Sequence, residues 1–478
     1  MLFNSLVFVG FFAVVYGVYL ALQQRTTPQN VLLLVASYVF YSYWDWRFLS
    51  LILVSTVADY TIGLALGRTD GAIPANQRRR RLLVVASVGI NLGILGFFKY
   101  FNFFADSLVD VLHLFGMRAD PTTLRVVLPI GISFYTFQTM SYTIDIYRGA
   151  LAPTRNLLNF AVFVAFFPQL VAGPIERARN LLPQIEAPRH ITAAMVDSGL
   201  FLILWGYFKK VVIADTAGLI SDQVFNNYTD HHGLAIIVGV LAFSVQIYGD
   251  FSGYSDIARG LARLMGIELM VNFKLPYFAL NPSDFWRRWH ISLSSWLRDY
   301  LYIPLGGNRR GPARMYAALS ITMLLGGLWH GAAWNFVIWG AFHGLILVLY
   351  RLFERRPMDR DPWGGDFATP TVLAKMGLMF VLTLLGWLVF RSTSVHQIGY
   401  MLGHASLVPG PGALHLLTKL AKVSAPLIAM QVLQYRSGDL LIPTKLRLPM
   451  RILVYTALLT GILLFGVRES IEFIYFQF

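Results

Sequence analysis

The sequence predicts an all-α integral membrane protein that crosses the bilayer many times. Hydrophobic residues make up 56% of the 478 residues, charged residues only 13%, and the mean hydropathy is +0.57. These values lie far from those of soluble proteins. Apolar runs about as long as a bilayer-spanning helix fill most of the chain, and we estimate roughly ten to twelve crossings. Some shorter runs are expected to be re-entrant helices, covered by protein or water.

The organisation along the chain predicts one polytopic domain that covers residues 1–478. Internal repeats, low-complexity segments and soluble domains are not evident between the apolar runs. The motifs that suggest chemistry fall in a core region of about 125–350, and further helices are expected over about 370–478.

The net charge of +14 would suggest a nucleic-acid partner in a soluble protein. Here the basic residues cluster between apolar runs, at 78–81, 287–314, 351–360 and 436–451, and are typical of cytoplasmic loops. We therefore expect no nucleic-acid partner. The absence of cysteine excludes disulfides, thiol catalysis and thiolate metal sites.

A polar stretch at 248–256 packs two acids, two serines and two tyrosines into the end of an apolar run. A hard-cation site usually needs more oxygen ligands than this, so we predict no metal. A polar network that orients a re-entrant turn is the preferred interpretation.

Residues 272–312 form the longest interruption of membrane-like sequence and predict an amphipathic helix at the cytoplasmic interface. Ser283 is the predicted N-cap, and no proline or glycine follows it before Pro304. Apolar side chains recur at helical spacing on one face, and arginines and serines fall mostly on the other. His290 lies on the apolar face, so its ring is expected to point inward. That face comprises Phe285, Trp286, Trp289, His290, Leu293, Trp296, Leu297 and Tyr300.

His330 is the most informative residue, because it lies in a stretch at 315–350 that has no Lys, Arg, Asp or Glu. This stretch is long enough to cross a bilayer, or to form a helical hairpin broken near Gly331. An ionisable ring at membrane depth is costly, so a functional role is the default interpretation. The structural alternative is a core histidine held by a backbone carbonyl. For His343, in the same stretch, we expect a packing or supporting role.

Two histidines approached from the cytoplasmic side suggest acid–base chemistry, since histidine exchanges protons near neutral pH. A Gly-x-Ser-x-Gly motif is absent, which favours direct acyl transfer over an acyl-serine intermediate. Phosphate-binding glycine motifs are absent too, which argues against an ATP-driven pump or a dinucleotide enzyme. The arginines near His290 suit the phosphates of an anionic acyl carrier such as coenzyme A, or simply the lipid headgroups.

We name His330 and His290 as candidate catalytic residues. Substrate contacts are expected from their neighbours and from one residue near the carboxyl end, where interfacial anchoring is the structural alternative. These candidates are Trp286, Arg287, Arg288, Trp289, Trp329, Asn335 and Tyr475.

At these residues the chain resembles the membrane-bound O-acyltransferase family, in its bacterial branch that acetylates exported polysaccharides such as alginate or cellulose. The similarity extends over nearly the whole chain. The segments that carry it are 128–135, 169–177, 250–256, 285–305, 324–331 and the terminal Phe-Ile-Tyr-Phe-Gln-Phe.

The resemblance implies a ring of helices whose re-entrant and interfacial helices form a funnel. It also implies acetyl-CoA as a cytoplasmic donor, no permanently bound cofactor, and outward delivery of acetyl across the bacterial inner membrane. His330 corresponds to the essential histidine of the family and His290 to its other frequent histidine. The family usually works with an exported or membrane-tethered acetyltransferase that modifies the sugar. The immediate acetyl acceptor stays open between that partner, Tyr475 and the polysaccharide.

Several alternatives remain open on the sequence. The same mechanism would serve acetylation of peptidoglycan or D-alanylation of teichoic acid. A transporter of polysaccharide or acyl carrier without covalent chemistry is a different class, but it predicts matched inverted repeats that are not evident. A scaffold that only recruits an exported enzyme has no need of an inward-pointing histidine pair.

Overall fold

The computed structural model describes residues 1–69, 71, 73–117, 125–171, 173–353, 369–467, 471 and 473–474, without the side chain of Ala75. The regular elements in these ranges are helices, and the only β-type pairing among them is an isolated bridge between Gly233 and Ala405. The predicted all-α membrane class is confirmed.

Seven helical stretches in the described ranges are long and apolar enough to cross a membrane. Two of them, Thr26–Gly67 and Asn76–Leu114, each contain two α-helices, joined in the first by the 3-10 segment Trp46–Phe48 and in the second by the π-helical segment Gly96–Tyr100. The estimate of ten to twelve crossings stays a prediction. The other five are Leu234–Leu264, Trp334–Phe353, Pro370–Arg391, Ala413–Ser437 and Leu448–Phe465.

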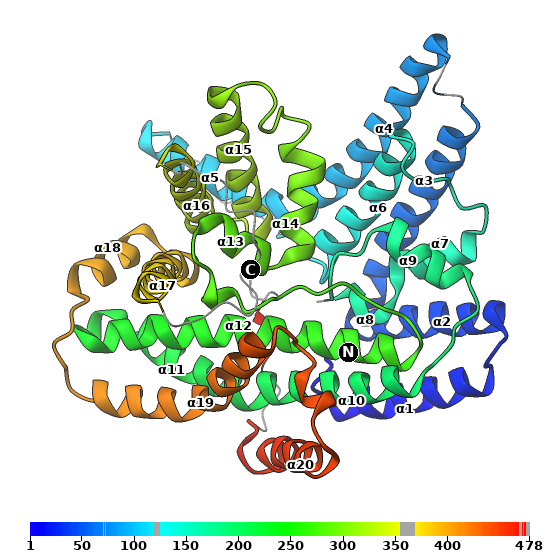
Figure 1. Cartoon of the computed structure of the whole chain (residues 1–478). Coiled ribbons are helices and arrows are strands. Elements are labelled where there is room, and N and C mark those ends of the chain that lie inside the picture. The colour runs from blue at the N-terminus through cyan, green and yellow to red at the C-terminus, as the bar shows by residue number, and fades with distance from the viewer. Residues whose placement is uncertain are drawn as a thin grey trace. The chain divides into compact units, whose positions relative to one another are not determined.

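The chain divides into two compact units (Figure 1). The first contains Met1–Met195 and Leu261–Met270. Its helices are α1 (Leu6–Ala21), α2 (Thr26–Asp45), α3 (Leu49–Gly67), α4 (Pro74–Leu95), α5 (Phe101–Leu114), α6 (Ile132–Tyr147), α7 (Leu157–Ala165), α8 (Phe167–Leu170) and α9 (Ala178–Glu186).

Inside the first unit, α3, α4 and α6 pack around a buried carboxylate, Asp59. Ser87 donates a hydrogen bond to Asp59 Oδ1 at 2.6 Å, and the Asn91 amide donates to Oδ2 at 2.7 Å. Thr139 of α6 donates to the amide oxygen of Asn91 at 3.1 Å. Polar side chains of three helices thus compensate the loss of water around Asp59.

The second unit contains Val196–Gly260 and Val271–Phe478 and holds all the described candidate site residues. A few residues of α10 and α12 fall in the first unit. The helices of the second unit are α10 (Ala193–Tyr207), α11 (Asp215–Asn226), α12 (Leu234–Leu264), α13 (Pro282–Arg288), α14 (Ile291–Leu297), α15 (Pro312–His330), α16 (Trp334–Phe353), α17 (Pro370–Arg391), α18 (Val395–His404), α19 (Ala413–Ser437) and α20 (Leu448–Phe465).

Helices α15 and α16 pack side by side as a hairpin, which confirms the helical break predicted near Gly331 (Figure 1). Glycines make the close crossing possible. A Cβ atom on Gly327 would lie 2.2 Å from the carbonyl oxygen of Phe336, and one on Gly340 would lie 2.5 Å from that of Met323. Because α15 ends at His330, the candidate base lies at the mouth of the hairpin turn.

The prediction of one continuous amphipathic helix capped by Ser283 is wrong in two respects. The cap is Asn281, whose side-chain oxygen accepts a hydrogen bond from the Asp284 amide at 2.8 Å. The helix also breaks after α13, because Trp289 is extended and His290 has left-handed backbone angles, with φ 43° and ψ 55°. The break allows the side chains of both residues to be buried.

The re-entrant turn expected at 248–256 is also wrong, because these residues lie within the uninterrupted helix α12. The predicted polar network exists. It faces the π-helical segment η3 (Phe208–Ala214), which continues α10 into α11.

Candidate active site

The two candidate histidines lie next to each other, with 6.4 Å between their ring centroids. His330 ends α15, and His290 begins α14. His330 is 3% exposed and His290 is fully buried, so both rings point inward. Residues 40 positions apart in the sequence therefore meet at one place.

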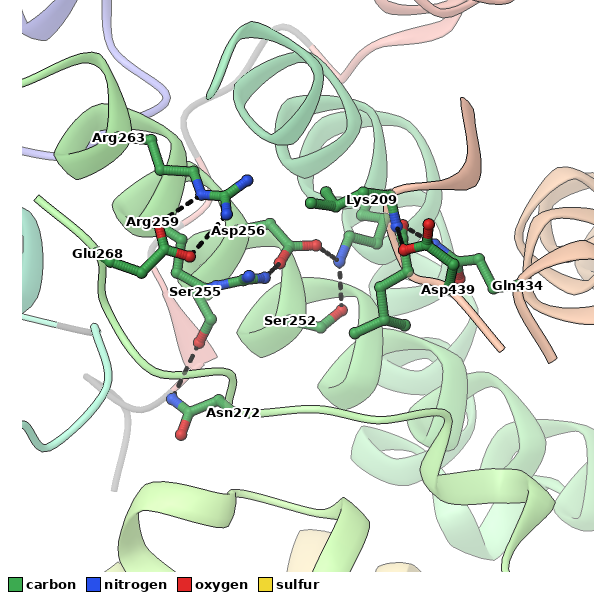
Figure 2. Close-up of polar contacts among 12 residues, drawn as sticks. Lys209, Ser252, Ser255, Asp256, Arg259, Arg263, Glu268, Asn272, Gln434 and Asp439 are labelled. Atoms are coloured by element: carbon green, nitrogen blue, oxygen red, sulfur yellow. Dashed lines mark hydrogen bonds and ion pairs between the residues drawn. The ribbon is translucent and has the colours of Figure 1, made fainter. Parts of the chain in front are cut away.

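The backbone that follows His290 is held by two hydrogen bonds to Asn272. The Ile291 amide donates to the Asn272 carbonyl at 2.9 Å, and the Ser292 amide donates to its side-chain oxygen at 3.2 Å. Asn272 in turn donates to Ser255 Oγ at 3.2 Å, as Figure 2 shows. A left-handed histidine costs about 1–2 kcal/mol of backbone strain. Such strain is typical of sites where an exact side-chain position matters.

Burial lowers the pKa of His290 to about 3, so its ring is neutral at physiological pH. A neutral imidazole can donate one hydrogen bond and accept another. At this pKa the ring is a weak proton acceptor, which suits positioning better than proton transfer.

Aromatic rings enclose the pair. His330 contacts Trp329, Trp339 and Phe390, with centroid distances of 5.2, 5.0 and 5.6 Å. His290 contacts Trp329 at 5.8 Å and Phe251 at 4.6 Å. These rings exclude water, which would protect a reactive acyl group from hydrolysis.

His343 joins the same cluster through Trp339. The centroids of the two rings are 4.5 Å apart, and Trp339 also contacts His330. His343 further contacts Trp286 of α13 at 5.1 Å. The separation of His330 and His343, which the sequence could not fix, is thus bridged by one indole.

A cavity of about 410 Å³ opens beside this cluster, between α13, α14, α15 and α16. Its wall includes three arginines, several hydroxyl groups and one face of Trp286. It combines charges that suit phosphates with an apolar interior. The lining residues are Ser283, Trp286, Arg287, Ile291, Ser294, Ser295, Leu297, Arg298, Tyr302, Leu319, Thr322, Met323, Leu347 and Arg351.

The remaining candidate residues occupy different places. Trp286 and Arg287 line the cavity, whereas Arg288 is buried in an ion pair with Asp284 at 2.8 Å. Trp289 is 1% exposed and packs on Trp387 at 4.8 Å, within the aromatic core.

The other three are more dispersed. Trp329 contacts both histidines. The Asn335 amide donates to the Phe390 carbonyl at 3.0 Å, beside the hairpin turn. Tyr475 lies outside the described residues.

The sequence analysis missed two buried lysines, Lys209 and Lys210. Figure 2 shows Lys209 of η3 reaching α12, where it donates to Ser252 Oγ at 2.9 Å and to Asp256 at 2.7 Å. Arg259 also pairs with Asp256, at 3.2 Å. The available signal was a pair of lysines inside an apolar run, since charges at membrane depth usually have partners.

Lys210 lies between two carboxylates, 2.7 Å from Asp215 and 3.1 Å from Asp250. Burial raises the pKa of Asp215 to about 7. Asp250 also accepts a hydrogen bond from the backbone amide of Ile474, at 2.7 Å. This cluster therefore ties the carboxyl-terminal segment to α12.

The described residues contain no group of three or more His, Asp or Glu side chains placed to hold a metal ion. What the site offers is two imidazoles, indole N–H groups and a basic cavity. This set can move a proton and bind an anionic, partly apolar molecule.

Comparison with known proteins fits this chemistry. Residues 147–373 match the membrane-bound O-acyltransferase family model. A probable alginate O-acetylase of Pseudomonas putida is 44% identical over 406 residues, which cover 84% of this chain and 80% of that protein.

More distant relatives have related activities. A peptidoglycan O-acetyltransferase of Helicobacter pylori is 34% identical, over 83% of this chain and 78% of that protein. A teichoic acid D-alanyltransferase of Bacillus subtilis is 27% identical, over 56% of this chain and 70% of that protein. The chain therefore belongs to the membrane-bound O-acyltransferase family and is a multi-pass membrane O-acyltransferase.

Proposed function

We propose that this enzyme takes acetyl from acetyl-CoA at the cytoplasmic face of the bacterial inner membrane and passes it outward for O-acetylation of an exported polysaccharide such as alginate. The observation that carries the proposal is the buried His330–His290 pair, 6.4 Å apart, beside a cavity lined by arginines. Relatives named as O-acetylating enzymes span most of the chain and support acetyl as the transferred group.

The basic cavity is the proposed donor site. Arg287, Arg298 and Arg351 lie on its wall, and Arg298 also pairs with Asp299 at 2.7 Å. The guanidinium groups of Arg287 and Arg351 are the proposed partners of the phosphates of coenzyme A. The apolar interior suits the uncharged arm that ends in the thioester. Trp286 lies between this cavity and the Trp339–His343 pair, so the acetyl group would pass that side chain to reach His330.

His330 is the proposed general base. It takes the proton of the acceptor hydroxyl while the oxygen attacks the acetyl carbonyl carbon. The new C–O bond forms as the C–S bond breaks, and the proton passes to the leaving thiolate to give free coenzyme A. His290, with its lowered pKa, would stay neutral and position the reacting groups.

The acceptor in this scheme is a hydroxyl on the outer side. It belongs to an exported or membrane-tethered acetyltransferase, to Tyr475, or to the polysaccharide itself. The backbone amide of Ile474 donates to Asp250, and Phe473 packs on Phe251, which contacts His290. This anchoring supports a role for the carboxyl-terminal segment near the reaction path.

A second candidate function is transfer of another acyl group, such as D-alanine to teichoic acid. It is supported by the weaker similarity to the Bacillus subtilis enzyme. Analysis of the ester released from the cell's polysaccharides by mild base distinguishes acetate from alanine.

The proposal is tested in inverted membrane vesicles from cells that carry the whole acetylation system, supplied with radiolabelled acetyl-CoA. The wild type should release free coenzyme A and label the polymer, and His330→Ala should do neither while remaining folded. His415→Ala, at an exposed histidine of α19, is the matched control. A wild type that releases no coenzyme A would favour a transporter, and an active His330→Ala would refute the base assignment.

A further inference from the structure

Three buried ring nitrogens in the aromatic cluster that contacts His330 have no hydrogen-bond partner in the described part of the chain. They are Nε1 of Trp286, Nε1 of Trp339 and Nδ1 of His343. Trp339 is 1% exposed and His343 is 2% exposed. Buried polar groups of native proteins nearly always have partners, so such nitrogens are expected to meet a ligand or water.

These three rings form one cluster, which we call the Trp–Trp–His cluster. The centroid distances are 5.7 Å between Trp286 and Trp339, 5.1 Å between Trp286 and His343, and 4.5 Å between Trp339 and His343. One side of the cluster reaches the basic cavity through Trp286, and the other reaches His330 through Trp339. The three rings therefore connect the cavity wall to His330.

The chemistry of these groups narrows the ligand. An indole nitrogen is a donor only, and a neutral imidazole donates from one nitrogen. A set of neutral donors suits a neutral oxygen that becomes negative during the reaction. The carbonyl oxygen of a thioester is such an atom, because attack at its carbon places charge on it.

We propose that the indole N–H of Trp339 and the His343 imidazole bind the acetyl carbonyl oxygen and stabilise the oxyanion that forms on it, while Trp286 lines the entry to this position. This inference rests on the proposed acetyl transfer and adds catalytic residues to it. His330 removes the acceptor proton, and the Trp–Trp–His cluster holds the developing charge. When the C–S bond breaks, the carbonyl reforms on the transferred acetyl group and the proton reaches the thiolate.

Packing explains why His343 keeps this position. A Cβ atom on Gly386 of α17 would lie 2.9 Å from His343 Nε2, so a larger residue there would push the ring away. Phe285 also stacks near the ring, with a centroid distance of 6.1 Å and an interplanar angle of 11°. The imidazole is fixed by α13 and α17 as well as by its own helix.

The test removes the N–H group of Trp339 and keeps its shape, by replacing Trp339 with 3-benzothienylalanine, in which sulfur stands for the N–H. Initial rates of coenzyme A release are measured in the vesicle assay over a range of acetyl-CoA concentrations. Loss of one oxyanion donor should lower kcat by about 10²- to 10³-fold with little change in KM. The same replacement at Trp205, a buried indole that stacks on Phe208, is the control and should be neutral.

His343 provides a second arm that does not depend on the folding of the Trp339 variant. His343→Gln keeps a donor and should retain more activity than His343→Leu, which has none. A near-wild-type kcat in both the benzothienyl variant of Trp339 and His343→Leu would overturn the inference. It would indicate that the ring nitrogens bind ordered water and not the substrate. Such a result would leave the proposed function intact, provided that the wild type releases coenzyme A and His330→Ala does not.

Discussion

Two buried polar clusters in the second unit differ in how their hydrogen-bonding capacity is used. Around Lys210, each charge has a partner, since the ammonium group lies within 3.1 Å of both Asp215 and Asp250. Around Trp339 and His343, the rings are neutral, and two of their nitrogens have no hydrogen-bond partner in the described chain. Both clusters are buried to a similar degree.

This difference separates stability from function. In the lysine cluster the charges balance one another as ion pairs, so its natural role is to hold η3, α12 and residues 473–474 together. The aromatic cluster is incomplete, and its strained neighbour His290 adds a further local cost. Proteins usually retain such costs where a ligand repays them. Variants of the first cluster should therefore affect folding, and variants of the second should affect catalysis.

The largest expected effect is on the folding of the lysine cluster. Asp215→Asn and Asp250→Asn should each be tolerated, because the other carboxylate still balances Lys210. The double variant leaves a buried charge without an anion and should lose about 3–5 kcal/mol of stability. Thermal unfolding in detergent, followed by size-exclusion chromatography, measures this. A double variant as stable as the singles would contradict the assignment.

The pH dependence of stability offers a finer test of the same cluster. The folded pKa of Asp215, about 7, lies above its unfolded value near 3.8. The stabilising effect of its proton is therefore complete below the unfolded pKa and is lost as the pH rises through about 7. Relative to wild type, Asp215→Asn should gain stability between about pH 4 and about pH 7. A constant difference across this range would show that Asp215 does not titrate there.

Substitution of an arginine in the basic cavity should weaken the binding of acetyl-CoA. Arg351→Gln removes one of its charges, and we expect KM for acetyl-CoA to rise about tenfold, equivalent to about 1.4 kcal/mol, with kcat little changed. Arg436→Gln, at the exposed end of α19, is the control. Equal KM values for Arg351→Gln and Arg436→Gln would show that this cavity does not bind the phosphates.

Substitution of His290 should change stability least, and it separates the effect on stability from the effect on catalysis. His290→Asn places a residue that tolerates left-handed backbone angles at φ 43°, so stability should stay the same or rise by up to about 1 kcal/mol. Acetyl transfer should fall, because the imidazole is lost. Steady-state rates and thermal unfolding on one preparation test both parts. Loss of stability would indicate that His290 is held for packing alone.

The sequence was sufficient for the membrane class, the hairpin around Gly331 and the inward direction of His330 and His290. Helical periodicity and the cost of an ionisable ring in an apolar run are local signals, and they predicted these features. The break at His290 was missed because it depends on Asn272, a tertiary partner 18 positions away. Two lysines in an apolar run were visible, but their carboxylate partners on another helix were not.

The roles of the candidate site residues could likewise be predicted only in part. Trp286 and Arg287 line the cavity, whereas the neighbouring Arg288 is used in a buried ion pair with Asp284. One residue of separation on a short helix decides between the two roles, and sequence spacing alone gives no basis for the choice. His343 was expected to play a supporting role, and the structure brings it within one indole of His330.

The most direct test of the central claim is an electron cryo-microscopy structure of the enzyme with a non-reactive acetyl-CoA analogue in which a methylene group replaces the thioester sulfur. We expect phosphates against the cavity arginines and the carbonyl oxygen within hydrogen-bond distance, about 2.7–3.2 Å, of Trp339 Nε1. The carbonyl carbon should face His330. An analogue bound elsewhere, with His330 still sealed behind packed side chains, would contradict this expectation.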